Sequence, residues 1–244
     1  MFGITTIPGL VALFTIVGAI LSFYIYDYLG IKSKRVKVAE AKDSFDKIVG
    51  NLSSADNTTK LAAAIMLRRF LDGQNKRKRT FLFQESVNVI SSMLKVLPTG
   101  IFQKTLADGL AHAGNLARVD LQKTNLQDVY LGRKDETVIT VTDTDFYLAD
   151  LSYALLEHVS GKAIFYRAIL FCTQIKNSDL TGSSFREADL TRVNFKNVIL
   201  KDADFTDALN VPLRIKEKLK EGKYQDDAPV TAGHDLGLGK DIFF

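Results

Sequence analysis

The sequence predicts an all-β solenoid, a right-handed quadrilateral β-helix, preceded by an α-helical region and one transmembrane helix. Three observations support this fold class: an apolar residue at every fifth position over residues 112–210, an uncharged and mostly apolar run over residues 4–26, and amphipathic segments between the two. The expected organisation is a transmembrane anchor at 1–31, a helical cap at 32–111, the β-helix at 112–210, and a short capping helix with a flexible tail at 211–244.

The anchor is predicted from the N-terminal run. Twenty-odd apolar residues at about 1.5 Å each just cross a bilayer core of about 30 Å. A cleaved signal peptide is the alternative, but no Lys or Arg precedes the run and no small-residue cleavage site follows it. Lys32, Lys34, Arg35 and Lys37 come directly after it. The positive-inside rule therefore predicts a single-pass membrane protein with the bulk of the chain in the cytoplasm.

The helical region is predicted from four amphipathic segments, which cover residues 33–52, 58–73, 81–97 and 100–114. Gly50, Gly73 and Pro98 separate them, and Ser54, Asp56 and Asn57 offer N-caps for the second. Since a solenoid end exposes its core, we expect a helical layer there to act as a cap.

The β-helix is predicted from a strict five-residue period. A helix needs apolar residues three and four apart and a half-buried strand needs them two apart, so a period of five fits neither element. A square solenoid fits, because each five-residue unit forms one side and points its central residue inward. The residue two places before each centre is small or β-branched and should also face inward. The central residues are Leu116, Leu121, Leu126, Leu131, Phe146, Leu151, Leu156, Phe165, Leu170, Ile175, Leu180, Phe185, Leu190, Phe195, Leu200 and Phe205.

Units such as ADLTR, ADFTD, SDLTG and TNLQD resemble the A(D/N)LXX unit of the pentapeptide repeat family. Four units make one coil, so residues twenty apart should stack, and Phe165, Phe185 and Phe205 should form one aromatic column. More loosely, the last three predicted helices resemble the HEAT-like helical pairs that precede the repeats in some bacterial members of this family.

The period is interrupted twice. Residues 132–143 lack a clear period but keep its phase, so they either complete an irregular coil or leave as a short hairpin, and the alternation of VITVT favours the hairpin. Between His158 and Lys162 the phase slips by one residue, which predicts a tightened corner at Ser160 and Gly161. Such interruptions are either tolerated defects or places where binding loops project.

Charge is divided unevenly along the chain. Residues 32–80 hold 13 Lys and Arg against 5 Asp and Glu, whereas residues 114–210 hold 11 against 14. The densest basic run is Lys76, Arg77, Lys78 and Arg79, which either contacts anionic lipid at the membrane surface or forms a solvated loop.

No constellation of residues indicates catalysis. His112, His158 and His234 do not lie at metal-ligand spacing, Cys172 has no identifiable base, and the Asp residues recur with the repeat. We therefore expect no enzyme activity, no cofactor and no metal.

The function expected is a membrane-anchored scaffold that binds a protein partner at the cytoplasmic face, with self-association left open. The family resemblance implies an alternative, a DNA mimic that inhibits or protects a type II topoisomerase such as gyrase, for which the charge of the solenoid is weak. Nucleic-acid binding is not expected, because the basic run lacks interleaved aromatic residues.

Overall fold

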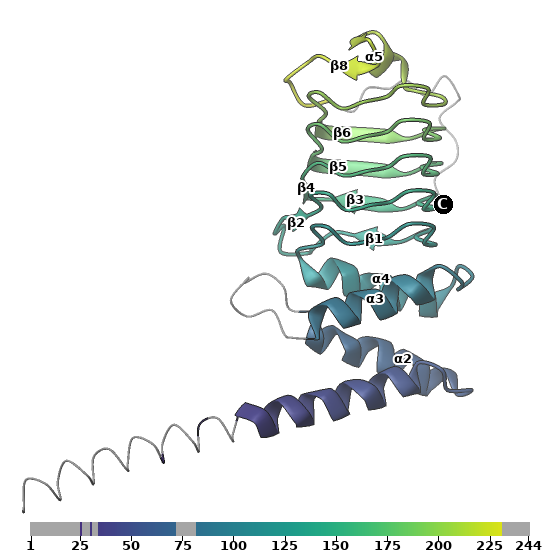
Figure 1. Cartoon of the computed structure of the whole chain (residues 1–244). Coiled ribbons are helices and arrows are strands. Elements are labelled where there is room, and N and C mark those ends of the chain that lie inside the picture. The colour runs from purple at the N-terminus through teal and green to yellow at the C-terminus, as the bar shows by residue number, and fades with distance from the viewer. Residues whose placement is uncertain (1–24, 26–29, 31–33, 72–81, 231–244) are drawn as a thin grey trace, which may run out of the picture. The chain divides into compact units, whose positions relative to one another are not determined.

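The computed structural model describes residues 25, 30, 34–71 and 82–230, and Figure 1 shows its elements. The chain divides into two compact units, Met1–Lys47 and Ile48–Phe244. In the first unit, residues 34–47 are helical, and Lys34, Arg35 and Lys37 are exposed.

The predicted anchor lies outside the described residues, apart from Ile25 and Gly30. Lys32 and the basic run at 76–79 also lie outside them. Within the described ranges, the helices are too short or too polar for any of them to cross a membrane.

Helices precede the solenoid in the second unit, as predicted. They are α2 (Asn57–Leu67), the 3-10 helix η1 (Arg68–Phe70), α3 (Phe83–Leu94) and α4 (Ile101–Ala113). Asp56 caps α2 by accepting hydrogen bonds from the backbone N–H groups of Thr58 and Thr59. Burial of Leu67, Ile90, Leu94, Leu106 and Leu110 packs the layer together.

The solenoid follows, with six short strands that run parallel to one another: β1 (Tyr130–Leu131), β2 (Ile139–Thr140), β3 (Leu155–Glu157), β4 (Val159–Ser160), β5 (Gln174–Asp179) and β6 (Asn194–Ile199). In Figure 1 the coils lie one above another, with the helical layer at one end. All sixteen central residues are at most 3% exposed. The predicted β-solenoid with preceding helices is therefore confirmed.

Each coil has four sides, which we number by their stacked central residues. Side 1 holds Leu116, Val141, Leu180 and Leu200; side 2 holds Leu121, Phe146, Phe165, Phe185 and Phe205; side 3 holds Leu126, Leu151, Leu170 and Leu190; side 4 holds Leu131, Leu156, Ile175 and Phe195. The predicted aromatic column is confirmed on side 2. Phe165, Phe185 and Phe205 stack with ring centroids 4.9 Å apart, and Phe146 extends the column at the same spacing.

The five-residue unit has a local explanation. The residue two places after most centres, such as Arg118 or Tyr153, has a positive φ, which turns the chain through a corner. The Asp or Asn before a centre accepts a hydrogen bond from the backbone N–H two residues later, as Asp150 does from Ser152. These side chains therefore stabilise turns, which explains why Asp and Asn recur with the repeat.

The hairpin interpretation of residues 132–143 is wrong. β2 pairs in parallel with β4, and Ile139 and Val141 are buried in the core. Val141 occupies the central position of side 1, and Asn115 pairs with Thr140, twenty-five residues further along. One extra unit of five residues is thus inserted at the corner after Leu131, and the alternating segment belongs to the coil.

The phase slip is a tightened corner, as predicted. Gly161 occupies the central position of side 1 with a φ of +128°. A Cβ atom there would lie 2.4 Å from the Thr142 Oγ1 and 2.7 Å from its backbone nitrogen. Residues of this coil therefore pair with residues only nineteen positions further along the chain, as Ser160 does with Asp179.

The far end of the solenoid is closed by more than the predicted short helix. Helix α5 (Leu213–Lys216) buries Ile215, and a hairpin of β7 (Leu219–Lys220) and β8 (Lys223–Tyr224) follows. The Phe205 N–H donates to the Gly222 carbonyl, and Val230 pairs with Val198. Residues 222–230, assigned above to the flexible tail, are instead bonded to the last coil.

Gln103 of α4 closes the first coil. Its side chain is 1% exposed, and its Nε2 donates to the carbonyls of Asn125 at 2.9 Å and Gln127 at 3.2 Å. We expect Gln103→Leu to lower the free energy of unfolding by about 2 to 4 kcal/mol, because two carbonyls lose their partner. Urea unfolding of the full chain, followed by circular dichroism, measures the loss. The matched control is Gln84→Leu, whose amide bonds only to exposed Asn88; an equal loss in both variants would contradict the capping role.

Candidate functional site

The exposed apolar side chains of the solenoid gather on side 3. Within residues 112–210, all of which the structure describes, five large hydrophobic side chains are exposed: Val138, Leu148, Tyr153, Ile169 and Leu209. Val138 lies in the segment between sides 4 and 1. The other four lie on side 3 or at its corners, since Ile169 pairs with Asp150, Leu209 pairs with Asp189, and Leu148 and Tyr153 flank the same side.

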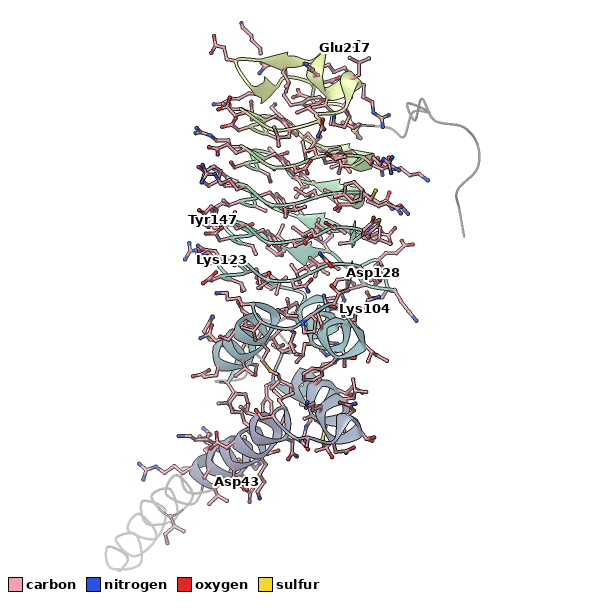
Figure 2. All side chains as sticks on the ribbon, turned by 90° about the vertical axis from the view of Figure 1, so that its right-hand side faces the viewer. Asp43, Lys104, Lys123, Asp128, Tyr147 and Glu217 are labelled. Atoms are coloured by element: carbon pink, nitrogen blue, oxygen red, sulfur yellow. The ribbon has the colours of Figure 1, made fainter. Side chains whose placement is uncertain are left out.

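Aromatic pairs stand at both corners of side 3. Tyr147 and Tyr166 stack at the corner shared with side 2, with ring centroids 5.4 Å apart. Tyr153 meets Phe171 edge to face at the corner shared with side 4, also at 5.4 Å. Figure 2 shows Lys123 and Tyr147 along one edge of the solenoid and Asp128 along the opposite edge. Rings of this kind supply large contact areas at protein interfaces with little loss of conformational entropy.

An ion-pair network holds the first of these corners. Arg167 donates from Nε to Glu187 at 2.6 Å, Tyr166 donates from its hydroxyl to the same carboxylate at 2.9 Å, and the guanidinium lies 5.2 Å from the Tyr166 ring centroid. The hydrogen bond from Arg167, followed by that from Tyr166, lowers the pKa of Glu187, and the bond to Glu187 raises the pKa of Tyr166. Glu187 is therefore ionised at neutral pH and keeps both partners in place.

At its edge, side 3 also meets the helical layer. Lys104 of α4 forms an ion pair with Asp128, and Figure 2 shows the two residues at the same edge of the molecule. Thr99 and Gln127 are hydrogen-bonded at 2.5 Å, and the backbone N–H of Asn125 donates to Leu94. The first coil of side 3 is therefore covered, and the open part of the side begins at Asp150.

The candidate metal ligands do not come together in the part of the chain that the structure describes. Within residues 34–71 and 82–230, no group of three or more His, Cys, Asp and Glu side chains could hold a metal ion. Cys172 is half-buried at a corner, and His158 has a positive φ at the corner between sides 4 and 1. What side 3 offers chemically is a contact surface of apolar, aromatic and charged side chains.

Sequence reasoning placed the central residues but missed side 3. The signal was present, because Ile169 and Leu209 stand where the repeat usually has Asp or Asn. At that outward position Ile169 and Leu209 are exposed, since the centre and the residue two before it already fill the core. Of the predicted basic residues, Lys34, Arg35 and Lys37 lie on the N-terminal helix, and the others lie outside the described residues.

Comparisons with known proteins agree with the coil geometry. The family model of pentapeptide repeats matches residues 168–207, with eight copies of the repeat. Among curated proteins, no sequence matches this chain.

Several solved structures are similar to part of the chain. A pentapeptide repeat protein from the Arabidopsis thaliana thylakoid lumen is 23% identical with a TM-score of 0.26, and the match covers 43% of this chain and 72% of that one. HetL, from the cyanobacterium Nostoc and involved in regulating heterocyst differentiation, is 24% identical with a TM-score of 0.20, over 39% of this chain and 46% of its own.

A trypsin-treated form of QnrB1, a plasmid-mediated fluoroquinolone resistance protein, is 13% identical with a TM-score of 0.24, over 39% of this chain and 55% of its own. The match thus spans about half the length of HetL and of the trypsin-treated QnrB1. Likenesses of this strength carry no information about activity or partners. The family match shows that residues 168–207 of this chain are pentapeptide repeats, and these repeats lie in the four-sided coils of the β-solenoid described above.

Proposed function

We propose that this pentapeptide repeat protein is a non-catalytic scaffold that binds a protein partner through side 3 of its solenoid. The observation that carries the proposal is the gathering of Leu148, Tyr153, Ile169 and Leu209 on one side. Exposed apolar patches beside Tyr and Arg residues mark protein interaction sites.

Site-specific photocrosslinking tests this proposal. A photoreactive phenylalanine analogue replaces Tyr153 or Ile169 in the full chain, expressed in its own cells. The matched controls carry it at Ile164 on side 2 or Ser160 on side 1. We expect adducts of one common mass from the two side 3 positions only. Adducts of the same mass and yield from all four positions, or none from side 3, would overturn the proposal.

We further propose that the scaffold is held at the cytoplasmic face of a membrane by residues 4–26. The uncharged composition of that run and the exposed Lys34, Arg35 and Lys37 after it support this arrangement. The preceding helices, which loosely resemble HEAT-like pairs, then serve as the membrane-side cap of the solenoid. Alkaline extraction of membranes is the test: recovery of the full chain in the supernatant would remove the anchor from the proposal.

Mimicry of DNA is not favoured as the function. A mimic of duplex DNA presents a continuous negative surface, whereas several acidic residues of this solenoid are paired with basic ones. The pairs include Arg118 with Asp143, Arg167 with Glu187, and Arg186 with Asp204. The surface is thus of mixed sign.

A further inference from the structure

The outward residues along the middle of side 3 alternate between acidic and apolar. Asp150, Ile169, Asp189 and Leu209 are joined in this order by bridges between successive coils. Neighbouring strands lie about 4.8 Å apart, so the four side chains form a ladder about 14 Å long. A binding partner that fits this ladder presents basic and apolar side chains in alternation.

The two carboxylates of the ladder remain available to a cation. Asp150 accepts hydrogen bonds from the Ser152 N–H and from the Gln127 side chain, and Asp189 accepts from the Thr191 N–H at 3.0 Å and from the Thr191 hydroxyl at 2.5 Å. Among the described residues, neither carboxylate takes part in a salt bridge with Lys or Arg. Because a carboxylate has about four acceptor sites, each can still receive a Lys or Arg side chain.

The backbone of side 3 excludes strand addition. The Ile169 N–H donates to Ala149, the Leu170 N–H donates to Asp189, and the Asp189 N–H donates to Ala168. These bonds run between coils and leave no open strand edge on this side. A peptide that binds here must therefore satisfy its own backbone, as an α-helix does.

We propose that side 3 binds one amphipathic helix of a protein partner, lying parallel to the solenoid axis, with basic residues at i and i+7 and apolar residues at i+3 and i+10. At a rise of about 1.5 Å per residue, these positions meet rungs about 4.8 Å apart with a mismatch below about 1 Å. The basic residues face Asp150 and Asp189, and the apolar residues face Ile169 and Leu209. Leu148 and Tyr153 flank the helix.

The size of the ladder favours a single helix over a globular face. A length of about 14 Å accommodates just under three turns of helix. A stable interface between folded proteins buries about 800 Å² on each partner, more than such a strip provides. This inference rests on the function proposed above, and it names the partner segment that the scaffold recognises.

The test uses a fluorescein-labelled peptide of about sixteen residues, a little over four turns of helix. It carries Lys at i and i+7 and Leu at i+3 and i+10 in an Ala- and Gln-rich background, and a control peptide has Glu in place of both Lys. Binding to the full chain, purified in mild detergent, is measured by fluorescence anisotropy. We expect the Lys peptide to bind and the Glu peptide to bind at least about tenfold more weakly, since both charge pairs become repulsive.

Variants at equivalent repeat positions separate side 3 from the other sides. Asp150→Asn with Asp189→Asn removes both charges while an amide oxygen can still cap the turn, and it should weaken the Lys peptide about three- to tenfold. The matched control is Asp145→Asn with Asp179→Asn, on sides 2 and 1, which should leave binding unchanged. Ile169→Ser should weaken binding, whereas Ile164→Ser should not.

Each outcome separates this inference from the proposed function. If the Lys peptide does not bind, or if the control pair weakens it as much as the side 3 pair, the helix inference is wrong. Crosslinks from Tyr153 and Ile169 to a loop or a globular face of the partner would also overturn it but would support the proposed function. Crosslinks to a second copy of this chain would overturn it and leave side 3 as a surface for self-association.

Discussion

Phe185→Ala should lower the free energy of unfolding by about 3 to 5 kcal/mol. Phe185 is fully buried in the middle of the side 2 column, with Phe165 and Phe205 each stacked at 4.9 Å and Phe195 edge-on at 6.0 Å. The substitution removes the ring, and the coils above and below cannot close the cavity because their backbones are hydrogen-bonded to one another. Thermal and urea unfolding of the full chain, followed by circular dichroism, measure the effect.

Two variants sharpen the Phe185 experiment. Phe185→Leu keeps most of the buried volume and should cost less than about 1.5 kcal/mol. Phe205→Ala should cost less than Phe185→Ala, because Phe205 stacks on one ring of the column and is slightly more exposed. Equal melting of Phe185→Ala and the unmodified chain would show that this column does not hold the solenoid together.

Gly161→Ala should lower the free energy of unfolding by about 2 to 5 kcal/mol, through strain and overpacking together. The new Cβ atom would lie 2.4 Å from the Thr142 Oγ1 and 2.7 Å from the Thr142 nitrogen, at a φ of +128°. The Thr142 nitrogen belongs to the coil below and cannot move without disturbing the pairing of β2 with β4. Unfolding in urea gives the size of the loss.

Gly182→Ala is the matched control for Gly161→Ala. Gly182 also has a positive φ, +69°, but a Cβ atom there meets only the Lys162 side chain, at 3.8 Å. Its cost should be about 1 to 2 kcal/mol, that of a left-handed conformation alone. If both variants lose the same stability, the close approach to Thr142 has no energetic consequence.

The solenoid core could be predicted from the sequence because the residue types within each five-residue unit show which of its side chains are buried. Leu, Ile or Phe at the centre and a small residue two places earlier are needed in every unit, so the signal repeats along the chain. The interruption at 132–143 could be located but not interpreted, since VITVT reads as an isolated strand whereas Ile139 and Val141 complete a coil. The period also could not show that Gln103 of α4 closes the first coil.

The core of the solenoid follows from local sequence patterns, whereas the composition of side 3 follows from tertiary structure. The sequence by itself determined the four-sided core and the preceding helices, because their patterns repeat within a few residues and follow from burial alone. Only the tertiary structure decided that Leu148, Tyr153, Ile169 and Leu209 share one side, that one unit is inserted after Leu131, and that a hairpin lies on the last coil. The first two features depend on pairing shifts of twenty-five, nineteen and twenty residues between coils, and the hairpin depends on antiparallel bridges to the last coil. The packing of successive coils sets those shifts, and no single unit contains them.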